Sequence, residues 1–97
     1  MSINIGNYTF EGPYGETTYL KDKSGVYAIL CKNSGKYHPV DLGESETVKS
    51  RVENHNRESC WTRNCSGTLT FAVLYTPDRQ LIEQTLRKQY NFPCGER

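Results

Sequence analysis

A guanidinium and an imidazole lie on one face of an expected helix in the middle of the chain. The helix is predicted over residues 46–55, and the residues on this face are Val48, Arg51, Val52 and His55. Their i, i+3, i+4, i+7 spacing is that of a helix surface that packs on a neighbouring layer. Because the face begins apolar and ends polar, we expect Arg51 and His55 to be presented at the rim of the covered surface.

The polar segment 57–67 follows, with two arginines and Trp61 between two cysteines, and it is predicted to be a loop. Arginines next to an aromatic ring can contact phosphates and stack on a base. They can equally anchor the segment over the sheet. The second reading is favoured, because tryptophan is usually mostly buried.

Four cysteines give a second possible site. Cys60 and Cys65, with His55 or Cys94, would supply four zinc ligands, but structural zinc sites normally use two closely spaced pairs, and no second pair is present. Free, partly buried thiols are therefore expected, with Cys31 among them. The N-terminal residues do not resemble a secretion signal, and no apolar run is long enough to span a bilayer. A cytoplasmic protein that does not associate with a membrane is therefore predicted.

The overall charge does not favour a dedicated nucleic-acid binder. The 97 residues hold 12 Lys and Arg against 11 Asp and Glu, for a net charge of +1. Such proteins usually carry a clear basic excess. Any contact with nucleic acid must come from a local patch or from a partner chain.

The pattern of apolar residues predicts an α+β fold in a single domain, residues 1–97. Its core, residues 24–95, has the order ββαβα, with a small three-stranded antiparallel sheet flanked by helices. The expected strands are residues 26–31, 37–42 and 68–75, and the expected helices are residues 46–55 and 77–90, the latter with Leu81, Ile82, Leu86 and Tyr90 on one side. Residues 1–23 are expected to be a mostly irregular N-terminal extension with one short edge strand at residues 7–10.

The first two core strands are predicted to form a hairpin. The run 26–31 is continuously apolar and suits a buried central strand, and Asn33-Ser34-Gly35-Lys36 is a turn sequence. Pro39 lies in the returning strand and cannot donate a ladder hydrogen bond. This strand is therefore at the sheet edge, or Pro39 sits at a bulge.

Several residues in this order resemble the GIY-YIG nuclease family. Gly25-Val26-Tyr27 is similar to its first signature tripeptide, and Asp41-Leu42-Gly43 lies where the second belongs. The remaining matches are Arg51 to the catalytic arginine, His55 to a histidine of a restriction-enzyme branch, Glu83 to the metal-ligand glutamate, and Asn91 to an asparagine that closes the site in some members. Together they cover residues 24–95 in the expected order.

The resemblance implies an Mg²⁺- or Mn²⁺-dependent endonuclease that hydrolyses DNA. Tyr27, Arg51, His55 and Asp41 would be catalytic, Asn91 and Gly43 would contact the substrate, and Glu83 would hold the metal. Asp41 departs from the family, since the second tripeptide normally begins with tyrosine. An aspartate there is expected to act as an acceptor or a second metal ligand, or to mark a domain that binds without cutting.

Simpler interpretations exist for each residue alone. Tyr27 can be a core tyrosine, Arg51 can extend along apolar surface, and Glu83 can form ion pairs with Arg79 and Arg87 one turn away on either side. The alternative function is a catalytically degenerate module of the same fold that binds nucleic acid or protein. A protein partner or a homodimer is compatible with both functions.

Overall fold

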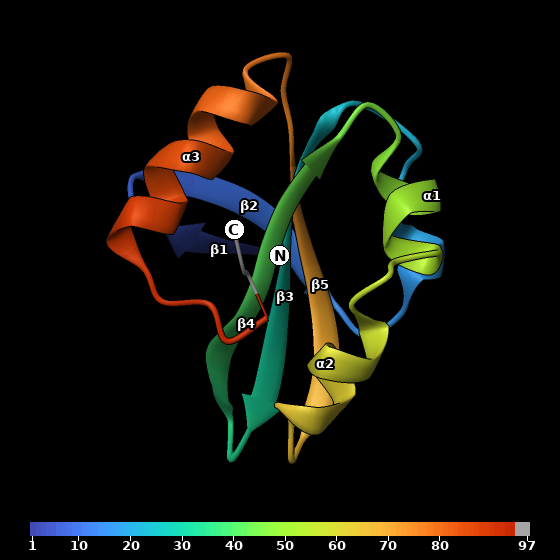
Figure 1. Ribbon diagram of the computed structural model, residues 1–97, viewed down its shortest axis with the longest axis vertical. Helices are drawn as coiled ribbons and strands as arrows, with labels where there is room; N and C mark the ends of the chain where they lie inside the picture. The colour runs from blue at the N-terminus through green and yellow to red at the C-terminus, as the bar shows by residue number, and fades with distance from the viewer. Residues whose placement is uncertain (95–97) are drawn as a thin grey trace.

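The computed structural model describes residues 1–94, which form a curled antiparallel sheet covered by helices (Figure 1). The strands are β1 (Ser2–Ile5), β2 (Tyr8–Tyr14), β3 (Gly25–Asn33), β4 (Lys36–Ser45) and β5 (Thr68–Tyr75), in the spatial order β1-β2-β5-β3-β4. The helices are α1 (Val48–Glu53), α2 (Glu58–Arg63) and α3 (Arg79–Gln89), with a short 3₁₀ helix η1 (Thr17–Tyr19). The α+β class is confirmed, but the described sheet has five strands where three were expected.

Strand β3 lies between β5 and β4 and is buried on both faces. Every residue from Gly25 to Cys31 is buried, which explains why this strand is continuously apolar and does not alternate. Its even-numbered residues (Val26, Ala28, Leu30) pack in one hydrophobic cluster, and its odd-numbered residues (Tyr27, Ile29, Cys31) pack in another. The sheet therefore separates two cores, and Tyr27 belongs to the second.

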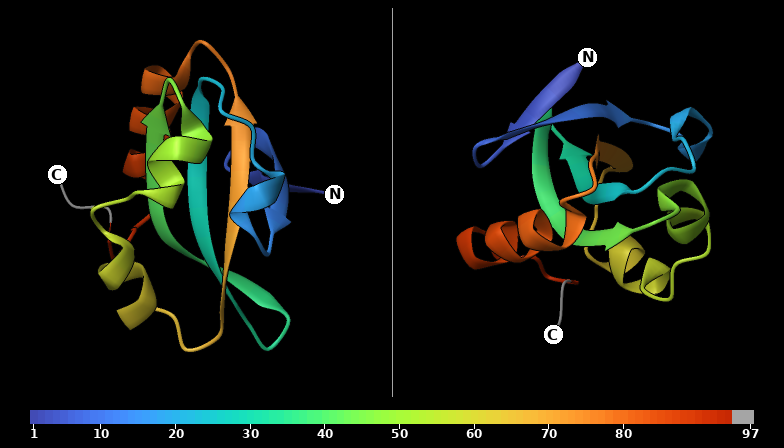
Figure 2. Two further views of the ribbon diagram at one scale, coloured as in Figure 1. Left: turned by 90° about the vertical axis from the view of Figure 1, so that its right-hand side faces the viewer. Right: turned by 90° about the horizontal axis from the view of Figure 1, so that it is seen from above.

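Different helices cover the two faces of the sheet (Figures 1 and 2). Helix α3 buries Ile82 and Leu86 in the cluster that also contains Phe10. On the other face, α1 contributes Val48 and Val52, while α2 contributes Trp61. Because β4 is an edge strand, the two helical layers can approach each other around it.

The N-terminal residues are more ordered than their composition indicated. Strand β1 pairs with β2, and β2 pairs with β5, so the expected irregular extension adds two strands to the sheet. Strand β2 continues through Gly12 and Pro13, where an end had been predicted, because both residues are buried against β5 at an irregularity in the register. Long-range pairing overrides the local breaker signal here.

The hairpin prediction is confirmed. Ser34 and Gly35 both have positive φ, 54° and 76°, as the tight two-residue turn between twisted strands requires. The register of β3 with β4 shifts between Ile29 and Leu30, which pair with Asp41 and Pro39, so Val40 is the extra residue of a bulge. Both explanations offered for Pro39 therefore hold: β4 is an edge strand and is bulged next to the proline.

The segment predicted as a loop contains helix α2, so that prediction was wrong. Helices α1 and α2 have only six residues each, shorter than the helix expected over residues 46–55. Trp61 is buried as favoured. Of the four residues predicted on one side of the last helix, Ile82 and Leu86 are buried, whereas Leu81 and Tyr90 are exposed.

The cysteines are not free thiols, which corrects a second expectation. Cys31 is bonded to Cys65, and Cys60 is bonded to Cys94. One bond fastens the segment after α2 to β3, and the other fastens α2 itself to the segment after α3. Since short helices are marginal in isolation, these bonds help to explain how α2 persists in a polar segment.

We expect both disulfides to contribute strongly to stability. Each bond closes a separation of 34 residues, for which chain entropy alone corresponds to about 3–4 kcal/mol in the free energy of unfolding. Replacing Cys60 and Cys94 together by alanine should lower that free energy by about 2–4 kcal/mol in urea denaturation without reductant.

The matched control is wild-type protein treated with a reductant, which should lose at least as much stability as the variant. Mass spectrometry after thiol alkylation provides the direct check. Four alkylated cysteines in non-reduced, folded protein would contradict the pairing.

Candidate active site

A cavity of about 220 Å³ opens beside the edge strand β4, with residues from both helical layers in its wall. Its lining is Tyr27, Gly43, Glu44, Arg51, Arg57, Glu83 and Arg87. Three guanidinium groups, two carboxylates and a phenol thus share one polar pocket. Guanidinium groups bind anions through directed, charge-assisted hydrogen bonds.

The Tyr27 side chain reaches the cavity by passing over Gly43, in the space that a side chain at position 43 would occupy. The two residues are paired on neighbouring strands, and a Cβ added to Gly43 would lie 2.2 Å from the Tyr27 hydroxyl. No side chain can occupy that space while Tyr27 keeps its position. Gly43 therefore serves the site by leaving room for the phenol, and it also lines the cavity.

His55 lies behind Tyr27, and its hydrogen bonds define its tautomer. The backbone N–H of Arg57 donates to Nδ1 at 3.1 Å, so in the neutral ring the proton is on Nε2. Nε2 lies 2.7 Å from the Tyr27 hydroxyl and donates to that oxygen. The phenol proton is then directed away from the ring, and neutral His55 has no free nitrogen with which to accept it.

Burial and charge keep both groups neutral. Burial, followed by the positive charges of Arg51 and Arg57, lowers the pKa of His55 to about 4. Burial raises the pKa of Tyr27 to about 12, against the opposing influence of Arg51. At neutral pH the pair is therefore an imidazole and a phenol, which suits hydrogen-bond donation by Tyr27 better than proton abstraction.

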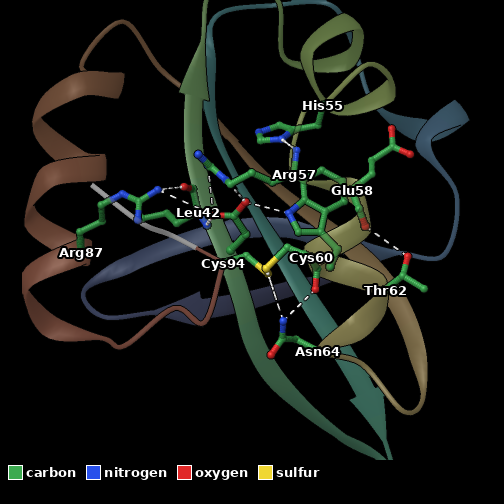
Figure 3. The surroundings of a disulfide bond; sticks show 11 residues. Leu42, His55, Arg57, Glu58, Cys60, Thr62, Asn64, Arg87 and Cys94 are labelled. Atoms are coloured by element: carbon green, nitrogen blue, oxygen red, sulfur yellow. Dashed lines mark hydrogen bonds and ion pairs between the residues drawn. A yellow bond between two sulfur atoms is a disulfide. The ribbon is translucent and has the colours of Figure 1, made fainter.

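Asp41 does not line the cavity. Its carboxylate is fully buried and accepts hydrogen bonds from Arg57 Nε (2.9 Å), Arg57 Nη2 (3.2 Å), Trp61 Nε1 (2.7 Å) and the backbone N–H of Leu42 (2.7 Å). Arg87 approaches the same carboxylate from the α3 side at 3.7 Å. Figure 3 shows Arg57 and Arg87 reaching toward β4 from opposite sides. In this position Asp41 orients arginines, and it lacks the access expected of an acceptor for substrate or of a second metal ligand.

Ion pairs organise the α3 side of the cavity. Arg87 Nε bonds to Glu83 Oε2 at 2.5 Å, one of the two pairs predicted for Glu83. Arg87 also donates to the carbonyl oxygen of Leu42. Arg79 turns instead to Glu44 and Glu46. These contacts fix Glu83 and Glu44 at the wall.

Arg51 differs from the other arginines of the lining. Its Nη2 donates to the side-chain oxygen of Asn56 at 3.0 Å, and within residues 1–94 it forms no ion pair with a carboxylate. Its charge is therefore the least compensated at the cavity. This is the guanidinium best placed to receive an anionic ligand.

The structure brings together most of the residues predicted for the site. Tyr27, Gly43, Arg51 and Glu83 line the cavity, and His55 is bonded to Tyr27. Asn91, predicted to contact the substrate, is exposed after α3 and does not line the cavity.

Sequence reasoning missed Arg57, Arg87 and Glu44 as parts of the site. Arg87 had a sequence signal, because it lies one helical turn after Glu83, but that spacing was interpreted only as an ion pair. Arg57 had been considered as a phosphate contact together with Arg63 and Trp61, but the reading of this segment as an anchor over the sheet was favoured. Glu44 had no local signal, since its part in the site depends on the approach of the helices to β4.

The donor atoms around the cavity do not fit a zinc thiolate site but are compatible with a magnesium-like ion. Within residues 1–94 no group of three His, Cys, Asp or Glu side chains is arranged to enclose a metal, and the disulfide-bonded cysteines are unable to serve as zinc thiolates. Glu83 and Glu44 place carboxylate oxygens at the cavity wall, where Glu83 is paired with Arg87 and Glu44 with Arg79. A magnesium-like ion that keeps several waters and shares a substrate phosphate fits such a sparse donor set.

Comparisons with known proteins give no match: no family model, no curated protein and no solved structure is significantly similar to this chain.

We expect the variant Gly43→Ala to disturb the site directly. The added methyl group cannot coexist with Tyr27, so the phenol must move or the β3–β4 pair must distort, at a cost of about 1–3 kcal/mol. Urea denaturation measures the cost, and the chemical shifts of the His55 ring report loss of its bond to Tyr27. Gly15→Ala is the control, since an added Cβ there meets open space. Equal stability of the two variants would contradict the described crossing.

His55 should make stability depend on pH. Its pKa is about 4 in the folded chain and about 6.5 when unfolded, so the unfolded state binds more protons between these values. The free energy of unfolding should therefore fall as pH decreases through this window, by about 3 kcal/mol in total. Urea denaturation at a series of pH values measures this loss.

The variant His55→Gln should lose the part of this pH dependence of the free energy of unfolding that His55 contributes. His38→Gln is the matched control, because His38 is the other histidine of the chain and is exposed on β4. An unchanged pH profile in His55→Gln would contradict the neutral buried ring.

Proposed function

We propose that this chain is a GIY-YIG-type endonuclease domain that hydrolyses DNA phosphodiester bonds with Mg²⁺ or Mn²⁺. The observation that supports it most is that Tyr27, Arg51 and Glu83 come from three elements and line one cavity, with His55 bonded to Tyr27. The sequence alone had indicated these four residues, all of them by the resemblance and Arg51 and His55 also by their helical spacing. Separate surface or core roles would not require them to converge.

Arg51 supplies the phosphate contact in this proposal. Phosphodiester cleavage places charge on the non-bridging oxygens of phosphorus. A planar guanidinium with no carboxylate partner in the described chain can donate two parallel hydrogen bonds to those oxygens. Lysine cannot reproduce that geometry.

Tyr27 orients the reacting groups by hydrogen bonding. Its raised pKa and the Nε2–H bond from His55 keep the phenol protonated, so its O–H is a donor for a phosphate oxygen or a water. His55 holds the phenol in place and is itself fixed by the Arg57 backbone N–H. Proton abstraction by Tyr27 would require a strong local fall in its pKa on substrate binding.

Glu83 would hold the metal. When bound, a divalent ion neutralises phosphate charge and stabilises the leaving oxygen. The Glu83 side chain is 13% exposed and lies at the cavity wall, with Arg87 directing its carboxylate. Arg87 can remain near the ion if it turns toward the substrate phosphate.

DNA is the proposed substrate although the chain is nearly neutral. The net charge is +1, but three arginines gather at the cavity, which is the local patch that the composition required. A core of this size needs further contacts to grip a duplex, and a protein partner or a second copy would provide them. No helix within residues 1–94 has the length and apolar character needed to cross a bilayer.

The cytoplasmic setting predicted from the sequence stays a prediction. Both disulfides oppose a strongly reducing compartment, where such bonds are rare in mesophiles. They favour action in an oxidising environment.

A second candidate is a module that binds nucleic acid without cutting it. The specific observation in its favour is the close pair of Glu83 with Arg87, which occupies an oxygen of the proposed metal ligand. In this case the cavity would hold a phosphate with no metal. Salt-sensitive DNA binding without cleavage in any divalent ion would identify it.

The activity prediction is nicking or cutting of plasmid or branched DNA in Mg²⁺ or Mn²⁺. Arg51→Ala and Glu83→Ala should each lower the cleavage rate at least about 100-fold, because each removes a charge-stabilising contact. Gel assays of plasmid conversion under single-turnover conditions measure this. Arg63→Ala is the matched control, since Arg63 is exposed on α2 and outside the cavity. Cleavage that persists in both site variants, or that EDTA does not stop, would overturn the proposal.

A further inference from the structure

We infer that Arg57 is a second phosphate-binding arginine of this cavity and that buried Asp41 is the residue that positions it. The inference rests on the proposed function, because it assigns the group that contacts the phosphate beside Arg51. It also gives Asp41 a role in place of the tyrosine that the resemblance leads one to expect. The Asp41–Arg57 pair would supply a fixed cationic donor at the site.

The orientation of Arg57 is set by one edge of its guanidinium. Nε and Nη2 bond to the two oxygens of Asp41, at 2.9 and 3.2 Å, which is the two-pronged arrangement of arginine with a carboxylate. A guanidinium has five N–H donors in a fixed plane, so the remaining donors lie on edges that Asp41 does not use. The Arg57 side chain is 28% exposed and lines the cavity.

Burial of the Asp41 carboxylate favours its role in orienting the Arg57 guanidinium. A fully buried carboxylate is costly unless its oxygens are hydrogen-bonded and its charge is paired. Trp61 and the backbone N–H of Leu42 occupy further acceptor positions, which leaves little freedom for the carboxylate to rotate. The rigid acceptor in turn holds Arg57 in one orientation.

Charge around the cavity favours an added anion. Glu44 is balanced by Arg79. The remaining charges are the guanidinium groups of Arg51, Arg57 and Arg87 against the carboxylates of Glu83 and Asp41, which leaves one positive charge in excess. Arg51 and Arg57 are the two of these arginines that come from the α1–α2 side, and both act electrostatically on the Tyr27–His55 pair. Because Tyr27, Arg51 and Arg57 all line the same cavity, we expect both arginines to contact a phosphate bound there.

Arg57 also connects phosphate binding to the Tyr27–His55 pair. Its backbone N–H fixes the His55 tautomer while its side chain faces the cavity. A shift of the Arg57 backbone would therefore change two things at once. It would move the guanidinium that contacts the phosphate, and it would alter the His55 ring whose Nε2–H bonds to the Tyr27 hydroxyl. This coupling is specific to the residue and is absent from Arg63 on the same segment.

The test measures DNA binding without cleavage. A fluorescein-labelled DNA duplex is titrated in EDTA by fluorescence anisotropy with the wild type, Arg57→Lys, Asp41→Asn and the control Arg63→Ala. Arg57→Lys keeps the charge but loses the planar fork, and should weaken binding about tenfold with little change in the salt dependence. Arg63→Ala should remain within about twofold of the wild type.

The variant Asp41→Asn distinguishes two effects of Asp41 on DNA binding, its negative charge and its role in orienting Arg57. It removes a negative charge near the DNA, so simple electrostatics predicts tighter binding, whereas loss of the anchor for Arg57 predicts binding about tenfold weaker. Circular dichroism and thermal unfolding identify a variant that fails to fold. In that case Arg57→Lys, whose side chain is partly exposed, carries the test alone.

The outcomes for this inference and for the proposed function are distinct. Weaker binding by folded Arg57→Lys supports the inference even if no divalent ion yields cleavage, which would refute only the endonuclease. Binding by folded Arg57→Lys within twofold of the wild type overturns the inference, even if the plasmid assay shows Arg51- and Glu83-dependent cleavage.

Discussion

The buried carboxylate of Asp41 is the interaction on which the site depends. It lies on the edge strand β4, where it meets Arg57 and Trp61 from one helical layer and Arg87 from the other. Breaking a buried pair by removing one partner typically costs about 3–5 kcal/mol, because an uncompensated charge is left behind. Arg57 and Trp61 hydrogen-bond to this carboxylate, and Arg87, which is bonded to Glu83 and to the Leu42 carbonyl oxygen, adds its charge at 3.7 Å. A cavity with members from both layers needs such a link around the sheet edge.

Arg57 and Trp61 reach Asp41 only while α2 keeps its position, which explains why two disulfides lie at or next to this short helix. Helix α2 has six residues and few apolar contacts apart from Trp61, so its own hydrogen bonds cannot maintain it. The disulfide of Cys60 and the disulfide of Cys65 fasten it from two directions. With α2 fixed, the Trp61 indole and the Arg57 guanidinium reach Asp41 with little remaining loss of conformational entropy. Cross-links and ion pairs thus stabilise the same segment.

Sequence reasoning succeeded where local signals and tertiary structure agree. The apolar run of β3, the turn at Ser34-Gly35 and the alternation of β5 were all visible because each depends on nearby residues. Strand β2 was cut short because Pro13 signals an end locally, whereas its pairing with β5 is set by residues far along the chain. The disulfides were missed for a related reason, since cysteine pairing depends on distances that spacing alone does not determine. In the site, the position of Arg51 followed from helical spacing. His55 lies beyond the end of α1 and is buried behind Tyr27, not on a helix face at the rim, and Arg57 required the position of Asp41.

The aspartate at position 41 changes how such a site is built. A tyrosine there could place its own hydroxyl toward a substrate, whereas the carboxylate is short, charged and fully buried. Its effect must pass through a longer side chain. Arg57 and Arg87 both contact it and line the cavity, and Arg57 is the one of the two that is hydrogen-bonded to it through two donors. The Asp41–Arg57 pair places a guanidinium at the cavity with Tyr27, and the positive charge of Arg57 favours the neutral form of His55 against the opposing influence of Asp41. The contacts of Arg57 and Trp61 with Asp41 therefore satisfy the buried carboxylate and at the same time hold a guanidinium at the cavity, which is what an anion-binding site requires.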